Sequence, residues 1–214
     1  MPRGGSVGWP SVKGDLPKAL PRLERAVGIC QDADLPAWFP RMTAALGAAY
    51  TLAGRIDDAV PLLTQAMEQM TAMGVVYYQA LCRLSLGEAQ MLAGRLEEAR
   101  ALAEGALALT HEYQERGHEV YALRLLGDIT AHSDLPDAAL AVARYQQALA
   151  LADELGMRPL QAHCRLGLGT LYAKIEQREQ ARAELSTAVE LYRTMDMTFW
   201  LPQAEAALVQ VEVR

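Results

Sequence analysis

A short pattern of small and apolar residues recurs along this chain. A Leu-Gly pair returns at intervals of 40, 40 and 42 residues, and after each pair come an apolar or aromatic position, a turn and a series of spaced alanines. The glycines of the four pairs are Gly47, Gly87, Gly127 and Gly169. In each unit, a helix that carries the pair ends near a glycine or glutamine, and a second helix begins shortly before an alanine. A fixed period of this length indicates a stacked array of helical hairpins.

The small residues also predict how the two helices of a hairpin pack. A glycine inside a helix costs about 1 kcal/mol relative to alanine, and close approach of a partner helix would recover that loss. The second helices carry small residues at spacings of four and seven, which keeps them on one face. These alanines are Ala59, Ala66, Ala99, Ala106, Ala141, Ala148, Ala181 and Ala188, and between them lie Leu63, Ala103, Tyr145 and Leu185. We therefore expect Gly87 and Gly127 to contact neighbouring helices.

Turn residues predict where the helices begin and end. Gly54 and Gly94 suit the left-handed position that ends a helix, and the carboxylates that follow them suit the first turn of the next helix. The interval from Gly127 to the next alanine of the series is two residues longer than in the preceding unit, so a longer turn is expected there. In that turn, Asp134 is expected to act as the N-cap and Pro136 to lie in the first turn of the helix.

This combination of positions resembles the tetratricopeptide repeat (TPR), which has a Leu-Gly pair, a tyrosine near the end of the first helix and small residues flanking a larger one on the second. Tyr50 and Tyr172 match the tyrosine position, whereas Gln90 and Thr130 depart from it. The resemblance covers about residues 15–192. It implies an all-α, right-handed superhelix of about four and a half antiparallel hairpins, with helices longer than in the usual 34-residue repeat. The chain also resembles the C-terminal TPR arrays of large bacterial signalling proteins, in which a nucleotide cyclase or DNA-binding domain is joined to a regulatory ATPase.

The sequence predicts different structures for the two ends of the chain. Residues 1–13 are expected to form a flexible leader, 14–198 the repeat array and 199–214 a C-terminal capping helix. The segment 14–27 matches the second helix of a repeat, but it is not preceded by the first helix that would cover part of its apolar stripe. That stripe comprises Ala19, Leu20, Leu23, Ala26, Val27 and Cys30. Uncovered apolar surface tends to find a partner, so we expect a homodimer through this N-terminal helix, or fraying of the helix.

Composition narrows the class of partner. At 51% hydrophobic residues, the chain has enough apolar surface for a continuous core, and its 214 residues suit a single array. A net charge of −6 without a local cluster of Lys and Arg makes nucleic acid and anionic membranes poor partners. No apolar run has the length of a signal peptide or a membrane span, so a cytoplasmic protein is predicted. Cys30, Cys82 and Cys164 are expected to be buried thiols, because cysteines two hairpins apart are beyond disulfide reach.

The sequence contains no convincing catalytic motif. Residues 4–8 fit G-x-S-x-G, the nucleophile elbow of serine hydrolases, but that elbow needs a strand before the serine, and a flexible leader is favoured. A phosphate-binding loop, H-E-x-x-H and paired C-x-x-C motifs are all absent. His111 and His118 could hold a metal if they shared a helix face, but Gly117 is expected to interrupt the helix between them. We therefore predict no enzyme activity, no cofactor and no metal site.

The remaining candidate site is the groove lined by the first helices. Residues one after each paired glycine, and three and six before it, are expected to face this concave side. The candidates are Arg41, Leu81, Leu84, Glu88, Tyr121, Arg124, Asp128, His163 and Thr170, with Ala44, Ala48 and Leu166 beside them. A clamp for a peptide carboxylate would need several converging Lys, Arg or Asn residues, which are missing. Tyr121 and Arg124 are the expected binding hot spots, and a solvated inner face without a ligand remains the alternative.

We therefore predict a protein–protein interaction scaffold, the regulatory or sensory arm of a larger bacterial signalling protein, with a protein or peptide segment bound in the groove. The alternative is a self-associating structural module in which the exposed ends of the array pair. A saturable ligand would indicate the first, and a mass that rises with concentration would indicate the second. Turnover of a substrate would indicate an enzyme instead.

Overall fold

A computed structural model describes residues 16–76, 78–133 and 137–213. Within these ranges the chain is entirely α-helix and turns, which confirms the all-α prediction. The helices are α1 (Leu16–Asp32), α2 (Phe39–Leu52), α3 (Ile56–Ala72), α4 (Gln79–Leu92), α5 (Leu96–Glu112), α6 (Arg116–His132), α7 (Ala138–Glu154), α8 (Arg158–Lys174), α9 (Arg178–Thr194) and α10 (Leu201–Val213). None of them combines the length and apolar content that crossing a bilayer requires.

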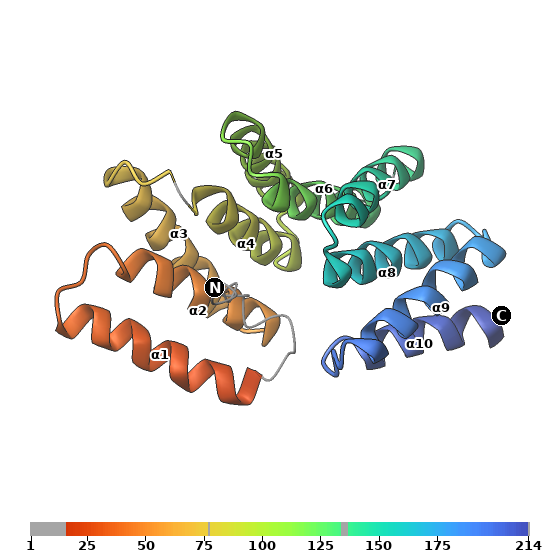
Figure 1. The fold of residues 1–214 in the computed structure, drawn as a ribbon, viewed down its shortest axis with the longest axis horizontal. Coiled ribbons are helices and arrows are strands. Elements are labelled where there is room, and N and C mark those ends of the chain that lie inside the picture. The colour runs from red at the N-terminus through yellow and green to blue at the C-terminus, as the bar shows by residue number, and fades with distance from the viewer. Residues whose placement is uncertain (1–15, 77, 134–136, 214) are drawn as a thin grey trace, which may run out of the picture.

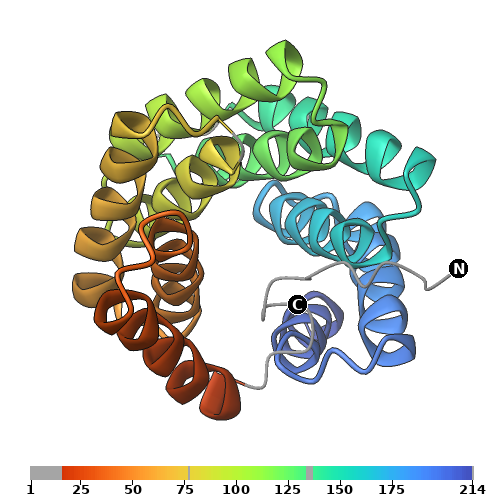
Figure 2. The same cartoon turned by 60° about the vertical axis from the view of Figure 1, so that its left-hand side comes forward.

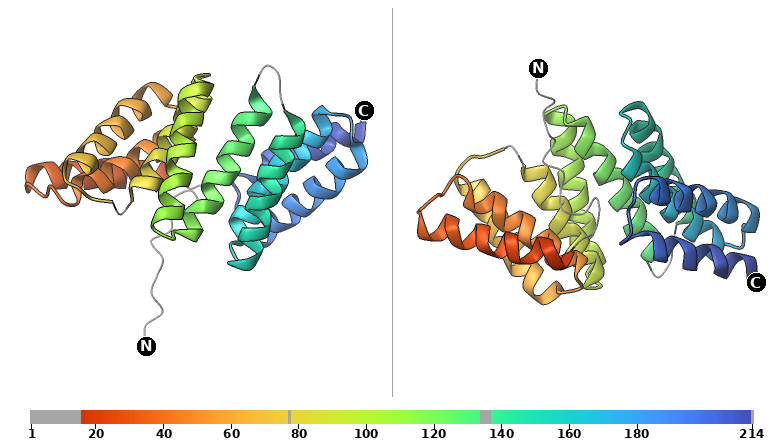
Figure 3. Two further views of the ribbon diagram at one scale, coloured as in Figure 1. Left: turned by 90° about the horizontal axis from the view of Figure 1, so that it is seen from above. Right: turned by 60° about the horizontal axis from the view of Figure 1, so that its bottom comes forward.

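The helices form a right-handed superhelix of antiparallel hairpins, as the resemblance to the TPR implies. The hairpins are α2/α3, α4/α5, α6/α7 and α8/α9; α1 packs before the first hairpin and α10 after the last (Figure 1). The first helices, together with α10, lie inside the curve, and the second helices form the outer layer (Figure 2). Figure 3 shows the hairpins following one another from α1 at one end of the array to α10 at the other.

Close contact at the paired glycines is confirmed. A Cβ added to Gly87 would lie 3.0 Å from Cδ2 of Leu125 in the next hairpin, and one added to Gly127 would lie 3.0 Å from the ring of Tyr145. The equivalent Cβ atoms at Gly47 and Gly169 would lie 2.5 and 2.6 Å from Leu63 and Leu185. The alanines of the second helices are fully buried at these contacts: Ala59, Ala66, Ala99, Ala106, Ala141, Ala148, Ala181 and Ala188. Glycine is therefore required in the first helices because a neighbouring side chain occupies the space of its Cβ; that side chain comes from the paired second helix at Gly47, Gly127 and Gly169, and from the next first helix at Gly87.

The turns agree with the sequence at two positions and differ at two others. Gly54 and Gly94 have the expected left-handed backbone, with φ of 74° and 76°. Gly117 does not interrupt a helix, because α6 already begins at Arg116 and the left-handed turn residue is Gln114, with φ of 56°. The N-cap of α7 is Asp137, whose Oδ1 accepts a hydrogen bond from the backbone N–H of Leu140 at 2.9 Å. Asp134 and Pro136, which the sequence favoured for this start, lie outside the described residues, as do the leader at 1–13 and the G-x-S-x-G residues.

The apolar stripe of α1 is covered in part by the following hairpin. Leu20 and Leu23 pack against the core that α2 and α3 share, and Val27 and Cys30 are buried. α1 lies on α2 as each second helix lies on the first helix of the following unit, so the array itself covers the Val27 and Cys30 end of the stripe. Ile29, on another face of α1, is 51% exposed.

All three cysteines are buried free thiols, as expected. Burial raises the pKa of the Cys82 and Cys164 thiols to about 12. Both therefore stay protonated at neutral pH and behave as small core residues.

We expect Gly87→Leu to destabilise the protein by about 1–3 kcal/mol, because the new side chain would meet Leu125 and the backbone oxygen of Ala99. Urea unfolding measures the loss. Gly28→Leu is the control, since a Cβ added to Gly28 in α1 finds no atom within 4 Å. An unchanged unfolding midpoint for Gly87→Leu would contradict the packing described here.

Candidate ligand groove

A cavity of about 380 Å³ lies on the concave face of the array. Helices α2, α4, α6 and α8 line most of it, together with Trp200 directly before α10 and Gln203 within α10. Ten of the residues predicted to face the groove line this cavity: Ala48, Leu81, Leu84, Glu88, Tyr121, Arg124, Asp128, His163, Leu166 and Thr170. The spacing rule counted from the paired glycines thus places residues of four hairpins around one cavity.

Arg41 and Ala44 do not line the cavity. The guanidinium of Arg41 lies over the ring of Tyr78, 4.5 Å from its centroid, and 5.6 Å from that of Trp38. Arg41 is in the first turn of α2, close to the turn before α4, and there two aromatic rings hold its charge by cation–π contact. Ala44 is buried in the core of the first hairpin.

A charged cluster lies in the middle of the groove. Arg124 of α6 donates from Nη2 to Glu88 of α4, and from Nη1 to Oδ2 of Asp128 at 2.5 Å. The hydroxyl of Tyr145, from α7, donates to the other oxygen of Asp128 at 2.6 Å. The side chains of Arg124 and Asp128 are only 17% and 16% exposed. The cluster therefore joins three helices across two hairpins.

The protonation states in this cluster follow from burial and neighbouring charge. Burial lowers the pKa of Arg124, but the charges of Asp128 and Glu88 outweigh it and raise that pKa above its ordinary value. Burial, then the charge of Asp128 and the hydrogen bond to it, raise the pKa of Tyr145. At neutral pH, Arg124 is a cation and Tyr145 is a neutral hydrogen-bond donor.

A second polar group in the groove is the imidazole of His163. Its Nδ1 lies 2.7 Å from the hydroxyl of Tyr192, and its ring meets Trp200 edge-on with centroids 4.7 Å apart. Burial, and secondarily the charge of Arg124, lower the pKa of His163 to about 3. This histidine is therefore neutral at physiological pH and adds a ring, not a charge, to the groove.

We expect the buried neutral histidine to make stability depend on pH. The unfolded chain takes up a proton at His163 below its ordinary pKa of about 6.5, whereas the folded chain does so only near pH 3. Stability from this group is complete above about pH 6.5 and is lost as the pH falls towards 3, by up to about 1.4 kcal/mol per pH unit.

Urea unfolding at pH 7, 6 and 5 checks this expectation. The slope should be shallower in His163→Gln, which cannot titrate but can still hydrogen-bond Tyr192. Equal slopes for the wild type and His163→Gln would contradict a buried neutral imidazole.

Sequence reasoning missed several lining residues. Tyr145 reaches the groove from a second helix because Gly127 and Gly167 leave room for its ring; a Cβ at Gly167 would lie 2.5 Å from Cε1 of that ring. Gly167, a glycine outside the Leu-Gly pairs, is a sequence feature that could have predicted this close contact. Trp200 and Gln203 belong to the segment that resembled a first helix, so its inner face was predictable too. Lys174, in the last turn of α8, also lines the cavity and donates to the carbonyl of Ala131 at 3.3 Å.

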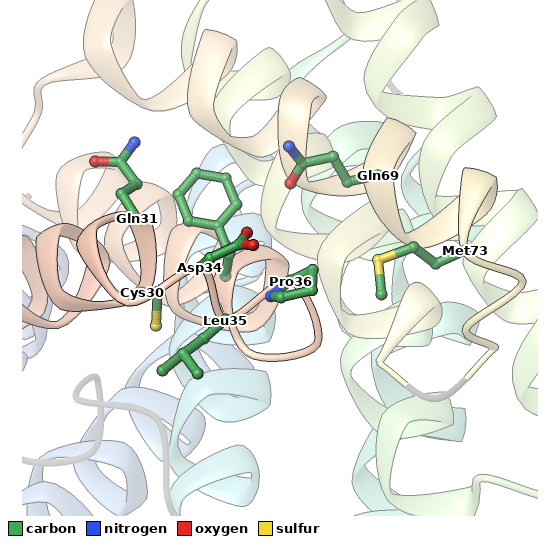
Figure 4. Close-up of a pocket in the computed structure, with 8 residues that line it drawn as sticks. Cys30, Gln31, Asp34, Leu35, Pro36, Gln69 and Met73 are labelled. Atoms are coloured by element: carbon green, nitrogen blue, oxygen red, sulfur yellow. The ribbon is translucent and has the colours of Figure 1, made fainter.

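A second cavity, of about 360 Å³, lies between the α1–α2 turn and α3 (Figure 4). Cys30, Asp34, Leu35 and Met73 are among its lining residues, and Oε1 of Gln69 is buried without a hydrogen-bond partner in the described part of the chain. Its polar groups do not converge on one point (Figure 4). This cavity offers less recognition chemistry than the groove.

Two histidine–carboxylate contacts lie at the turn between α5 and α6. Nε2 of His111 lies 3.1 Å from Oε1 of Glu119, and Nδ1 of His118 lies 3.0 Å from Oε2 of Glu115. The two histidines thus pair with separate carboxylates and do not converge. Within the described ranges, no three His, Cys, Asp or Glu residues are grouped as metal ligands would be.

Fold and groove together define this chain as a TPR-like helical repeat array. One similar solved structure is a signal transduction ATPase with numerous domains (STAND) from Pyrococcus horikoshii, which has a TPR sensor. It matches 92% of the chain, with a TM-score of 0.69 and 17% identity. TPR-like repeats of a kinesin light chain from Podosopora anserina match 85% of the chain and 88% of that protein, with a TM-score of 0.59 and 20% identity. These likenesses establish the fold.

One sequence relative covers most of the chain. The 43 kDa receptor-associated protein of the synapse from Tetronarce californica is 24% identical over 177 residues, 81% of this chain. No protein-family model matches. The chain spans 42% of that relative and 31% of the STAND protein chain, so each has a large part with no counterpart here.

Proposed function

We propose that this chain is a protein-interaction scaffold whose concave groove binds a segment of a partner protein. The observation that carries the proposal is the cavity, which runs along four first helices and combines apolar side chains with one compact charged cluster. Sites of this kind bind by apolar burial and gain specificity from a few placed polar groups. The proposed role of the groove is to bind a partner segment and not to convert a substrate, so the proposed protein is not an enzyme.

We further propose that the array is the regulatory or sensory arm of a larger bacterial signalling protein in the cytoplasm. The TPR sensor of the STAND protein, which shares the fold, supports this role. The net charge of −6 argues against nucleic acid and anionic lipid as partners.

A groove variant with a matched outer variant tests the binding proposal. Thr170 of α8 lines the groove, and Thr187 of α9 lies half-buried in the outer layer. Each hydroxyl donates to a carbonyl four residues earlier, at 2.8 and 2.9 Å. Peptides selected on the wild-type protein from a random display library are expected to bind Thr170→Arg at least about tenfold more weakly and Thr187→Arg unchanged. Equal binding to both variants, or no selected peptide at all, would contradict a groove site.

A second candidate function is self-association through the ends of the array. Exposed apolar side chains favour it, namely Ile29 on α1 (51% exposed) and Val209 on α10 (56% exposed). Light scattering over a concentration series, with Ile29→Glu and Val209→Glu beside the wild type, tests it. A mass that stays at that of one chain would leave the groove as the functional surface.

A further inference from the structure

We propose that the groove selects a partner segment that presents a lysine or arginine side chain between apolar residues, and that Glu88 receives the cation. This inference rests on the proposed function of the groove. It names the chemistry of the bound segment, which the fold alone does not determine.

The charge balance at the centre of the groove is negative. Arg124 supplies one positive charge, and Glu88 and Asp128 supply two negative charges. His163 adds none, because its lowered pKa keeps it neutral. The other cation of the lining, Lys174, is in the last turn of α8 and is hydrogen-bonded to the carbonyl of Ala131. An excess of one negative charge therefore remains beside Arg124.

That excess charge is accessible at Glu88 and not at Asp128. Both oxygens of Asp128 accept hydrogen bonds, from Arg124 and from Tyr145. Glu88 accepts from Arg124 through Oε1, while Oε2 has no partner among the described residues, and its side chain is 33% exposed. A ligand cation would find a charged acceptor there, which makes a stronger hydrogen bond than a neutral one does.

Arg124 is a poor receptor for a partner carboxylate. Two of its nitrogens already donate to carboxylates, and its third, Nε, is buried beyond contact with solvent. An acidic side chain in the groove would also meet the charges of Glu88 and Asp128. The cluster thus excludes a carboxylate, although it contains the arginine that a carboxylate clamp would use.

The surroundings of Glu88 suit a long basic side chain with apolar neighbours. Tyr121 and Glu88 line the same cavity. Burial raises the pKa of Tyr121, the charge of Arg124 lowers it and the charge of Glu88 raises it. An aromatic ring beside a carboxylate can hold an ammonium or guanidinium group by cation–π contact. Leu84 and Trp200 also line the cavity and offer apolar surface to the residues that flank the basic side chain.

Peptides are selected on the wild-type protein from a random display library. Their affinities for the wild type and for Glu88→Gln are then compared. Glutamine can still accept the hydrogen bond from Arg124 but lacks the charge. Glu184→Gln is the matched control, since Glu184 accepts a hydrogen bond from Arg165 at 2.8 Å and does not line the groove. Circular dichroism confirms that each variant is folded.

We expect the selected peptides to be enriched in Lys or Arg flanked by apolar residues. Their affinity should fall about tenfold or more in Glu88→Gln, stay unchanged in Glu184→Gln, and decrease with salt. Enrichment of acidic peptides, or basic peptides that bind Glu88→Gln as well as the wild type, would overturn the inference. In either case, loss of peptide binding to Thr170→Arg would still support the groove as the site. Peptide affinity that is the same for Thr170→Arg and the wild type would overturn the proposed function itself.

Discussion

Tyr145→Ala is expected to destabilise the protein by about 3–5 kcal/mol, as for other large aromatic residues removed from a core. The ring is 1% exposed and fills the space that Gly127 and Gly167 leave between α6 and α8. Its removal opens a cavity between two hairpins and takes away a donor to Asp128. Urea or thermal unfolding followed by circular dichroism measures the loss.

Tyr145→Phe separates packing from hydrogen bonding at this position. The ring remains, and only the bond to a carboxylate is lost, so we expect a cost of about 1–3 kcal/mol. Tyr113→Ala, at an exposed position after α5, should change stability by less than about 0.5 kcal/mol. If Tyr145→Ala were no worse than Tyr113→Ala, the two hairpins would not be joined as described.

Arg124→Met is also expected to cost about 3–5 kcal/mol. The methionine retains most of the volume but leaves Glu88 and Asp128 close together without their shared cation. Breaking a buried ion pair by removing one partner leaves uncompensated charge, which is the costly case. The same argument shows that reversing the charge of Arg124 would unfold the groove, so this residue is unsuitable as a probe of binding even though the sequence favours it as a hot spot.

Two further variants test whether unpaired charge causes the loss of stability in Arg124→Met. Arg116→Met removes an arginine that is 49% exposed and pairs with Glu154, and it should cost at most about 1 kcal/mol. Adding Glu88→Gln and Asp128→Asn to Arg124→Met removes the unpaired charges and should recover much of the lost stability. A triple variant as unstable as Arg124→Met would attribute the loss to packing instead.

The predictable part of this structure depends on interactions within one hairpin. Helical periodicity, the cost of glycine in a helix and the left-handed preference of Gly54 and Gly94 are local properties, and they located the hairpins and their close contacts. The groove positions followed from the same register, because residues at fixed offsets from the paired glycines face the same side of each first helix. Of the two exceptions, Ala44 is buried in the core, and Arg41 lies at the start of α2, close to Trp38 before that helix and Tyr78 before α4.

By itself, the sequence determined the repeat, the all-α class, the packing of glycine against the second helices and most residues of the concave face. Only the tertiary structure decided that Arg124 is neutralised by Glu88, 36 residues away, and that Tyr145 reaches the groove from the outer layer. It also decided that α2 covers much of the stripe on α1. The physical reason is that these contacts join different hairpins: their distances depend on how far one hairpin is rotated and shifted against the next, and no periodicity within a single helix encodes that geometry.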